Sequence, residues 1–266
     1  MPNNESASRG AKNEDSQNPS ADFKYEDLEL AISEMLKAGV HFGHKSSRWN
    51  PKMNPYIFGT RNGIHIIDLD KTLAMFQKAL EYIQQVVANG GKILFVGTKP
   101  QAQNVIRWAG EKTGMSYVVN RWLGGTFTNF NEIKKRIRYL NKQEEKLARG
   151  EFEKYTKYEQ GKIKKEIEKM NEKMGGIKRM ENFPQLIFAA DIKEDGLALK
   201  EARRMKIPIV AIADTNRDPT LADYVIPAND DALSSLKYIL GIVVKKIKET
   251  KSKTKPVSNN KPEIKN

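Results

Sequence analysis

Along most of the chain, short apolar runs alternate with amphipathic segments that have the 3.6-residue period of a helix. The runs that predict strands are Lys92 to Val96, Ser116 to Val119, Gln185 to Ala190, Pro208 to Ala213 and Tyr224 to Ile226. The segments that predict helices around them are 71–88, 101–112, 195–205 and 231–248. Strands rich in β-branched residues and separated by helices are typical of a parallel sheet covered on both faces. The sequence therefore predicts an α/β fold with a doubly wound, mainly parallel sheet.

The N-terminal part of the chain has a less regular pattern. Glu26 to Ala38 has one apolar face and stops at Gly39, which predicts a short helix. His41 to Pro55 has no period and is expected to form an irregular loop. Asn62-Gly63 lies between two short apolar runs and predicts a β-hairpin, because both residues tolerate positive φ angles. Asp70 is the expected N-cap of the helix that follows.

Residues 129–174 interrupt the alternation with two long, charged helical arms. Each arm keeps apolar residues three and four positions apart, and only Glu144 breaks the series in the first arm. These positions are Phe130, Ile133, Ile137, Leu140, Leu147, Ile163, Ile167, Met170, Met174 and Ile177. Gly150 and Gly161 bracket a connecting segment, so we expect an antiparallel coiled-coil hairpin with arms roughly 30 Å long at ~1.5 Å per residue. Such a rod is expected to project and to reach across a larger particle.

The charge of the chain indicates what that particle is made of. The formal net charge is +13, and residues 131–180 contain 16 Lys and Arg against nine Glu. This surplus favours contact with a polyanion. The alternative is a solvated helix in which Glu and Lys four positions apart pair with each other. The cluster Lys134, Lys135, Arg136 and Arg138 is less balanced than the rest of the arm and favours the first interpretation.

Composition excludes several other classes of protein. The chain has no cysteine, so disulfides, cysteine-ligated zinc and thiol catalysis are excluded, and a reducing, cytoplasmic setting fits. No apolar run is long enough to cross a membrane. Residues 1–22 are polar and acidic and resemble neither a secretory signal nor a transit peptide, so a disordered extension is expected. The lysine-rich end after Lys245 is expected to be a flexible tail that either binds nucleic acid or keeps the protein soluble.

The motifs that an α/β enzyme would need are weak or missing. Residues 96–100 follow a strand but match neither common glycine-rich phosphate loop. His41 and His44 have no evident third partner for a metal. Asp214 and Asp218 form either an acidic pair after a strand or, as we favour, an ordinary turn before Pro219. We therefore expect no catalytic residue, no metal and no cofactor.

Two loops combine cations with an aromatic ring. One contains Lys45, Arg48, Trp49 and Lys52, close to Arg61 in the hairpin; the other contains Arg121 and Trp122. Guanidinium groups match phosphate oxygens, and aromatic faces stack on unpaired bases. The alternative for both tryptophans is burial in the core.

These residues resemble those of the bacterial small-subunit ribosomal protein S-two family. The resemblance is carried by segments 36–44 (LKAGVHFGH), 48–53 (RWNPKM), 120–129 (NRWLGGTFTN) and 212–216 (IADTN). Segments 152–154 (FEK), 175–178 (GGIK) and 225–232 (VIPANDDA) agree as well, and the match extends in order from about Glu29 to Glu249.

The resemblance implies a flavodoxin-like sheet with an inserted coiled-coil hairpin and a structural role in the small ribosomal subunit of the cytoplasm. Its implied partners are small-subunit ribosomal RNA, which the family holds between head and body, and other ribosomal proteins, including the large messenger-binding protein S-one. No membrane, homo-oligomer or catalysis is implied. The residues that we expect to bind RNA are Lys45, Arg48, Trp49, Lys52, Arg61, Arg121, Trp122, Lys134, Lys135, Arg136 and Arg138.

The expected division of the chain is an extension at 1–24, an α/β domain at 25–128 and 179–249, the hairpin at 129–178 and a basic tail at 250–266. Two hypotheses of other classes remain open at this stage. One is an enzyme acting through Asp191, Asp214 and Asp218 at strand ends; the other is an interaction module whose hairpin packs on protein helices.

Overall fold

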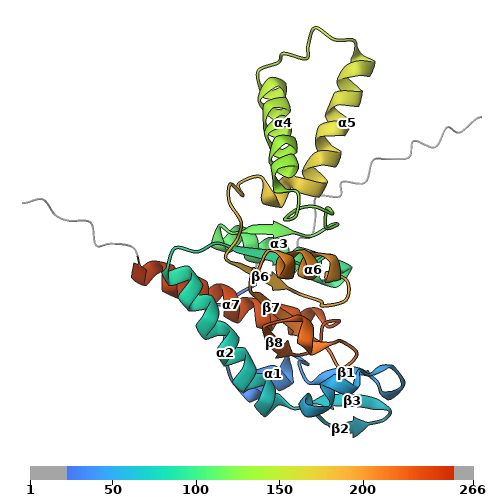
Figure 1. Cartoon of the computed structure of the whole chain (residues 1–266), viewed down its shortest axis with the longest axis vertical. Helices are drawn as coiled ribbons and strands as arrows, with labels where there is room; N and C mark the ends of the chain where they lie inside the picture. Colours follow the sequence, from blue (N-terminus) through green and yellow to red (C-terminus); the bar gives the residue numbers. More distant parts are fainter. Residues whose placement is uncertain (1–22, 255–266) are drawn as a thin grey trace, which may run out of the picture.

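A parallel sheet forms the centre of the molecule in the computed structural model, which describes residues 23–254 (Figure 1). Its five strands are β4 (Ile93–Val96), β5 (Ser116–Val118), β6 (Leu186–Ala189), β7 (Ile209–Ala213) and β8 (Tyr224–Pro227). They pair in the order β5-β4-β6-β7-β8, all parallel. In chain sequence this is the order 2-1-3-4-5 of flavodoxin-like sheets. The predicted α/β class with a parallel sheet is confirmed.

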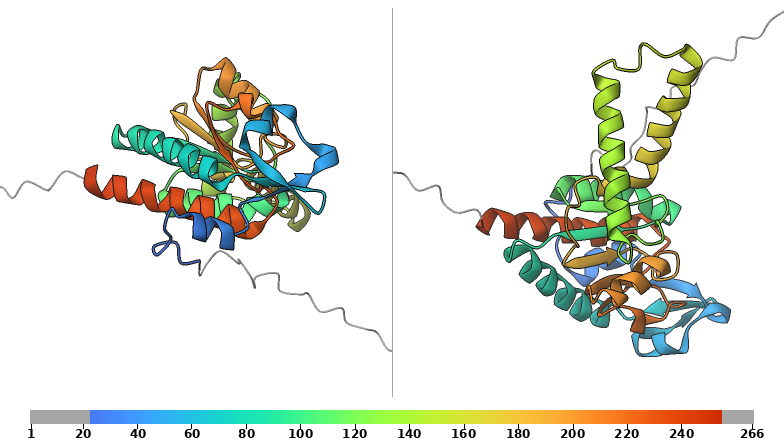
Figure 2. Two further views of the ribbon diagram at one scale, coloured as in Figure 1. Left: turned by 90° about the horizontal axis from the view of Figure 1, so that it is seen from below. Right: turned by 45° about the horizontal axis from the view of Figure 1, so that its top comes forward.

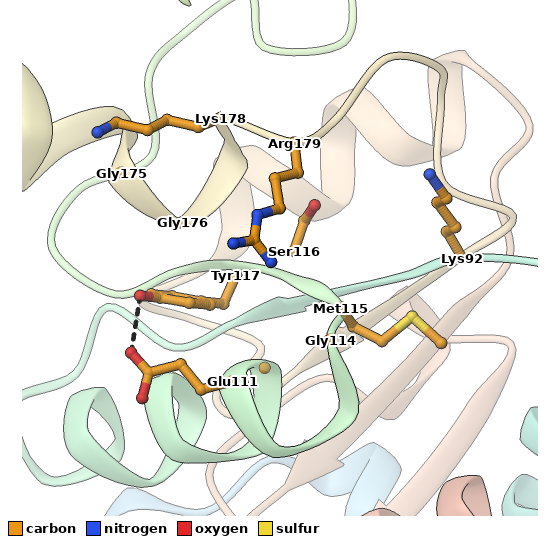
Figure 3. A pocket seen from close by; sticks show the side chains of 11 residues that line it. Lys92, Glu111, Gly114, Met115, Ser116, Tyr117, Gly175, Gly176, Lys178 and Arg179 are labelled. Atoms are coloured by element: carbon orange, nitrogen blue, oxygen red, sulfur yellow. Dashed lines mark hydrogen bonds between the residues drawn. The ribbon is translucent and has the colours of Figure 1, made fainter. Parts of the chain in front are cut away.

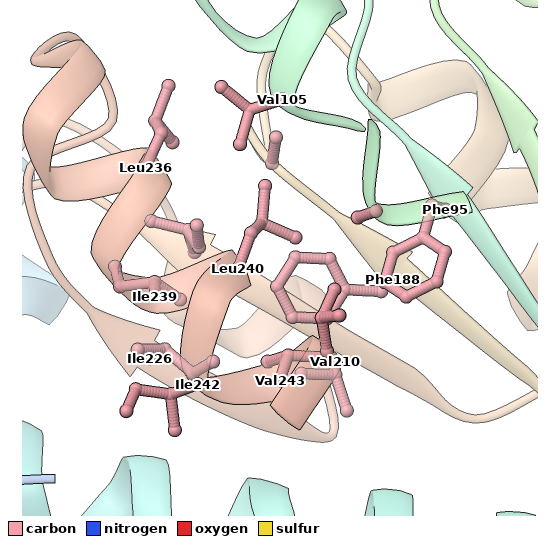
Figure 4. Packing of buried hydrophobic residues seen from close by; sticks show 14 of the residues in the cluster. Phe95, Val105, Phe188, Val210, Ile226, Leu236, Ile239, Leu240, Ile242 and Val243 are labelled. Carbon is pink, nitrogen blue, oxygen red and sulfur yellow. The ribbon is translucent and has the colours of Figure 1, made fainter. Parts of the chain in front are cut away.

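Helices cover both faces of this sheet because its strands are apolar on both sides. On one face α2 (Leu69–Ala88), α3 (Pro100–Thr113) and α7 (Leu233–Thr254) pack together, and Figure 2 shows α2 and α7 side by side. Figure 4 shows Leu240 and Val243 of α7 against Phe188 and Val210 of the strands. All four side chains are fully buried, and such burial stabilises the fold by about 1.5–3 kcal/mol per large side chain. The other face packs against α6 (Gly196–Arg204).

A second, antiparallel sheet lies at one end of the molecule. It consists of β1 (Phe42–Lys45), β2 (Ile57–Arg61) and β3 (Ile64–Ile67) in the order β1-β3-β2. Asn62 and Gly63 have positive φ angles of 51° and 74°, which confirms the predicted hairpin. The expected irregular loop at 41–55 is wrong in part, because it contains β1 and the short 3-10 helices η1 (Ser46–Arg48) and η2 (Pro51–Tyr56). The sequence of β1 has no alternation, and its pairing with β3 makes it a strand.

Several predicted helix ends are wrong by a few residues. The first helix, α1 (Ile32–Lys37), begins after the predicted Glu26. Helix α2 is capped by Asp68 rather than Asp70, because Asp68 Oδ1 accepts hydrogen bonds from the backbone N–H groups of Asp70 and Lys71 at 3.1 and 3.3 Å. Helix α7 continues to Thr254, so the first residues of the expected basic tail are helical.

The expected terminal extensions lie mostly outside the described residues, at 1–22 and 255–266. Phe23, which falls within the expected extension, already packs edge-on against Trp108 with ring centroids 5.5 Å apart.

Two helices rise from the sheet at the end opposite to β1–β3 (Figure 1). They are α4 (Phe130–Ala148) and α5 (Lys157–Met174), and the 3-10 helix η3 (Gly175–Ile177) follows α5. Helix α5 begins earlier than the expected Gly161, because Thr156 and Glu159 form a capping box. Glu144, which breaks the apolar series, accepts hydrogen bonds from Lys178 Nζ at 2.6 and 2.8 Å and from Asn171. Burial alone would raise the pKa of Glu144, but these bonds outweigh it and lower the pKa.

Candidate nucleic-acid interface

The loop between β5 and α4 is fixed by one carboxylate on α6. Glu201 is 6 % exposed and accepts hydrogen bonds from Trp122 Nε1 at 3.1 Å and from three backbone N–H groups. The backbone donors are Gly125 at 2.8 Å, Phe127 at 2.9 Å and Thr128 at 3.2 Å. Burial alone would raise the pKa of Glu201, but the hydrogen bonds outweigh it and lower the pKa. The loop that carries Arg121 into α4 is therefore held in one conformation.

This arrangement separates the two candidates of that loop. Trp122 is 5 % exposed and packs edge-on against Phe127 with ring centroids 5.1 Å apart. Its ring is a core residue with no free face for a base, so we remove Trp122 from the RNA-binding set. Arg121 is exposed, and it forms no ion pair with any residue of the described range 23–254.

The four cations at the start of α4 differ in how available they are. Lys134 lies over the ring of Phe130, 4.8 Å from its centroid, and Lys135 pairs with Glu132 at 2.7 Å. Arg136 and Arg138 are exposed, and neither has an ion-pair partner among the residues that the structure describes. Together with Arg121 they leave three unneutralised guanidinium groups around the root of α4.

The remaining candidates belong to the small sheet at the other end of the molecule (Figure 1). Lys45, Arg48 and Arg61 are exposed and lack ion pairs within residues 23–254. Trp49 is 39 % exposed and lies 5.5 Å from the ring of His65, so one side of its indole faces solvent. Lys52 is committed to Asp218 at 2.6 Å. The structure thus divides the predicted residues between two surfaces at opposite ends of the molecule.

A cationic pocket that the sequence interpretation did not single out lies between η3 and β5 (Figure 3). Its volume is about 470 Å³, and Lys92, Ser116, Tyr117 and Arg179 are among its lining residues. Figure 3 shows Arg179 extending over Ser116 and Tyr117 from one wall and Lys92 standing on the other. The signal in the sequence was two adjacent cations, Lys178 and Arg179, one residue after the Gly175-Gly176 pair.

The carboxylates at the strand ends are neutralised by cations of the chain itself. Asp191 pairs with Arg217 at 2.8 Å and with Lys99 at 3.5 Å; Asp230 pairs with the same two cations at 3.2 and 2.6 Å. Burial and the neighbouring Asp191 nevertheless raise the pKa of Asp230 to about 6. Asp218 Oδ1 accepts from the Thr220 backbone N–H at 3.0 Å, as expected for a turn residue. Lys99, the cation of residues 96–100, is occupied by carboxylates of the chain itself.

The group that can hold a cation is different from the one considered in the sequence. His44 lies 3.0 Å from Asp214 and 3.3 Å from Asp231, and with Asp230 their donor atoms all lie within 4.8 Å of one another. One imidazole nitrogen and three carboxylate oxygens are ligand types of divalent cations, but Asp230 and Asp231 already pair with Lys99 at 2.6 and 2.5 Å. The sequence gave no third partner for His44, because these aspartates come from distant strand ends. His41 does not join the group; its ring packs on Phe42 at 4.0 Å.

Comparison with known proteins identifies the family. The chain is an α/β protein with exposed, unneutralised cations on two surfaces, and its polar strand ends are closed by internal ion pairs. A family profile described as ribosomal protein S2 matches residues 35–250. The chain belongs to this family, which confirms the resemblance in its sequence; it is a ribosomal structural protein and not an enzyme, and the hypothesis of catalysis through Asp191, Asp214 and Asp218 is wrong.

Related proteins align with this chain along most of their length. The chain is 53 % identical over 210 residues to the small ribosomal subunit protein uS2 of Roseiflexus castenholzii, covering 79 % of this chain and 80 % of the relative. The proteins of the same name from Oleidesulfovibrio alaskensis and Dehalococcoides mccartyi are each 50 % identical, over 212 and 208 residues. These alignments cover 80 % and 78 % of this chain and 82 % and 85 % of the relatives. Within residues 23–254, no helix has the length and apolarity needed to cross a membrane.

Proposed function

We propose that this chain is a structural component of the small ribosomal subunit in the cytoplasm, where it binds small-subunit ribosomal RNA between head and body. The observation that carries the proposal is the set of exposed guanidinium groups at the root of α4, Arg121, Arg136 and Arg138, which lack an ion-pair partner within the described range. Exposed cations without a partner neutralise phosphates without first breaking an ion pair. Phosphate contacts position a protein but carry no sequence information, so the chain distinguishes its RNA from others by shape.

The two surfaces have complementary roles in this proposal. One contact lies on the small sheet and consists of Lys45, Arg48, Arg61 and the half-exposed Trp49. Lys52 also contacts RNA there once its ion pair with Asp218 is broken. The cations of α4, including Lys134 and Lys135, form the other. A rigid sheet between two contacts sets the distance between the RNA segments that they bind, which is the function of a brace.

Helices α4 and α5 are proposed to act as an antiparallel coiled coil inserted at residues 129–178 of the α/β domain at 25–128 and 179–249. The support is the burial of Ile133, Ile137, Leu140 and Ile167 between two helices that lie side by side in Figures 1 and 2. The large messenger-binding ribosomal protein S-one is proposed as a docked partner on the basis of the family resemblance, and no homo-oligomer is proposed.

The proposal is tested by removing one guanidinium from each surface. Arg48→Ala combined with Arg121→Ala should weaken binding to small-subunit ribosomal RNA and reduce the slope of log affinity against log salt by about 2, one unit for each lost phosphate contact. The control is Lys78→Ala combined with Lys112→Ala, which removes the same charge from α2 and α3. An equal effect of both double variants would contradict specific contacts. Crosslinks from hairpin lysines to protein alone would support the interaction-module hypothesis instead.

A further inference from the structure

A groove runs along the root of the helical hairpin beside Arg136. It consists of two adjoining cavities of about 340 and 230 Å³ that share Leu123 and Arg136. The smaller one is bounded by the Gly124-Gly125 loop and the start of α4; the larger extends across to Met170, Lys173 and Met174 of α5. We call this feature the root groove.

The floor of the root groove is apolar and one of its sides is aromatic. Leu123, Met170 and Met174 contribute the apolar surface, and Tyr139 of α4 lines the same cavity. Tyr139 is 46 % exposed, and its hydroxyl has no hydrogen-bond partner among residues 23–254. An aromatic ring at the side of an apolar floor offers a planar ligand a face to stack on.

The rim of the groove is cationic. Arg136, Lys169 and Lys173 line it, and none of the three forms an ion pair with another described residue. Two acids, Glu132 and Glu166, also line the groove, but Glu132 is neutralised by Lys135 at 2.7 Å. A ligand that is apolar and planar at its centre and negatively charged on its flanks matches this combination.

The wall formed by the loop is preorganised. The hydrogen bonds to Glu201 hold Gly125, Phe127 and Thr128 in place. Gly125 has a φ of +90°, a conformation that other residues rarely adopt, and an added Cβ atom there would lie 3.2 Å from Asn129 Cβ. A wall that is already ordered loses little conformational freedom when a ligand binds.

We infer that the root groove binds one unpaired nucleotide of small-subunit ribosomal RNA. The base stacks on Tyr139 and covers Met170 and Leu123, while Arg136, Lys169 and Lys173 contact the flanking phosphates. A nucleic acid is favoured over an apolar protein segment because the rim has three unneutralised cations around a cavity the size of a small-molecule site. The inference rests on the proposed RNA-binding function and adds a base contact to it.

The first test separates stacking from phosphate contact. Tyr139→Ala in the full chain should weaken binding to a transcript of the small-subunit ribosomal RNA about 5- to 100-fold, because base–aromatic stacking has that magnitude. The slope of log affinity against log salt should not change, since no cation is lost. Tyr139→Phe should bind as the unchanged chain does, because the stacking face is kept. The control is Tyr158→Ala, which removes another exposed tyrosine, one that lies under Lys162 on α5 and outside the root groove.

Equal affinities of Tyr139→Ala and the unchanged chain would overturn the inference. Circular dichroism and urea unfolding show whether each variant is folded. Tyr139→Ala should be folded, because alanine is a good helix former and replaces an exposed residue. If the unchanged chain itself binds the transcript weakly and without salt dependence, the proposed function fails rather than the groove.

A second measurement locates the base. In a transcript containing 4-thiouridine, irradiation of the complex should crosslink peptides that contain Tyr139 or Met170, and the yield should fall in Tyr139→Ala. Crosslinks confined to other peptides would overturn the inference. In assembled subunits, a chemical crosslink from Lys169 or Lys173 to a neighbouring protein, with no RNA adduct, would show that a protein segment fills the groove.

Discussion

Glu201 connects the core of the domain to the surface loop that precedes α4. Its carboxylate binds Trp122 and three backbone N–H groups of a segment far away in the sequence. In the sequence Glu201 is one polar position of an amphipathic segment, and nothing there indicates a partner. The cations Arg121, Arg136 and Arg138 were predictable because exposure is their default state. The role of Glu201 depends on tertiary contacts and was not predictable, and the sequence left burial of Trp122 open as an alternative to RNA contact.

Replacing Glu201 should therefore destabilise the fold. Glu201→Ala leaves several buried donors without an acceptor, and we expect the free energy of unfolding to fall by roughly 2–4 kcal/mol in a urea titration. Lys200→Ala, one position earlier on the exposed side of α6, is the control and should change it by less than about 0.5 kcal/mol. Equal stability of both variants would show that the loop is not held by this carboxylate.

Asp195 gives a prediction about pH. It is fully buried, and burial raises its pKa from 3.8 to about 6, although Thr98 donates to Oδ1 from its backbone and hydroxyl at 3.0 and 2.8 Å. Between those two values the folded chain binds more protons than the unfolded chain, so the free energy of unfolding decreases as pH rises. The decrease from this residue is about 3 kcal/mol, complete above about pH 6.

Asp195→Asn should remove that decrease, because the amide does not ionise and its oxygen still accepts from Thr98. The free energy of unfolding of both chains is measured by urea titration at a series of pH values from 4 to 7. As pH rises, the value for the variant should increase relative to that of the unchanged chain. The exposed Asp27→Asn is the control. A constant difference across the series would contradict the raised pKa.

At the scale of elements, long segments with a clear period were predictable and short ones were not. The strands β4 to β8 and the helices α2, α3 and α7 follow apolar patterns that the buried sheet requires. The strand β1 has only four residues, including Gly43, and exists because β3 pairs with it. An added Cβ at Gly43 would lie 2.6 Å from Thr215, so this strand also needs a close backbone approach that no local pattern indicates.

The start of α5 depends on a local motif. Thr156 accepts a hydrogen bond from the Glu159 backbone N–H, and Glu159 accepts one from the Thr156 N–H at 3.0 Å. Thr156→Ala should reduce helix stability by about 1 kcal/mol. Hydrogen exchange should accelerate in the first turn of α5 and stay unchanged in α4. Lys157→Ala, which leaves both capping bonds intact, is the control; acceleration in both variants, or in neither, would contradict the capping role.

At the scale of the whole molecule, the predicted RNA-binding residues lie on two surfaces with a rigid sheet between them (Figure 1). The sequence indicated which residues are cationic but not that the small sheet and the hairpin stand at opposite ends. That separation follows from the strand order. The small sheet lies near β8, at one edge of the parallel sheet, and the two helices of the hairpin follow β5, which is at the opposite edge. In the proposed function, this shape sets the separation between the two RNA segments that the surfaces contact.

The central claim, that the chain works by neutralising ribosomal RNA phosphates, is tested most directly by salt dependence. Binding of the full chain to a small-subunit ribosomal RNA transcript is measured between low and moderate salt, with an unrelated RNA of equal length as the control. The account predicts that log affinity falls linearly with log salt, by about 0.7 to 0.9 for each phosphate contacted, and stays higher for the ribosomal transcript at every salt concentration. An affinity that is flat across the series, or equal for the two RNAs, would contradict it.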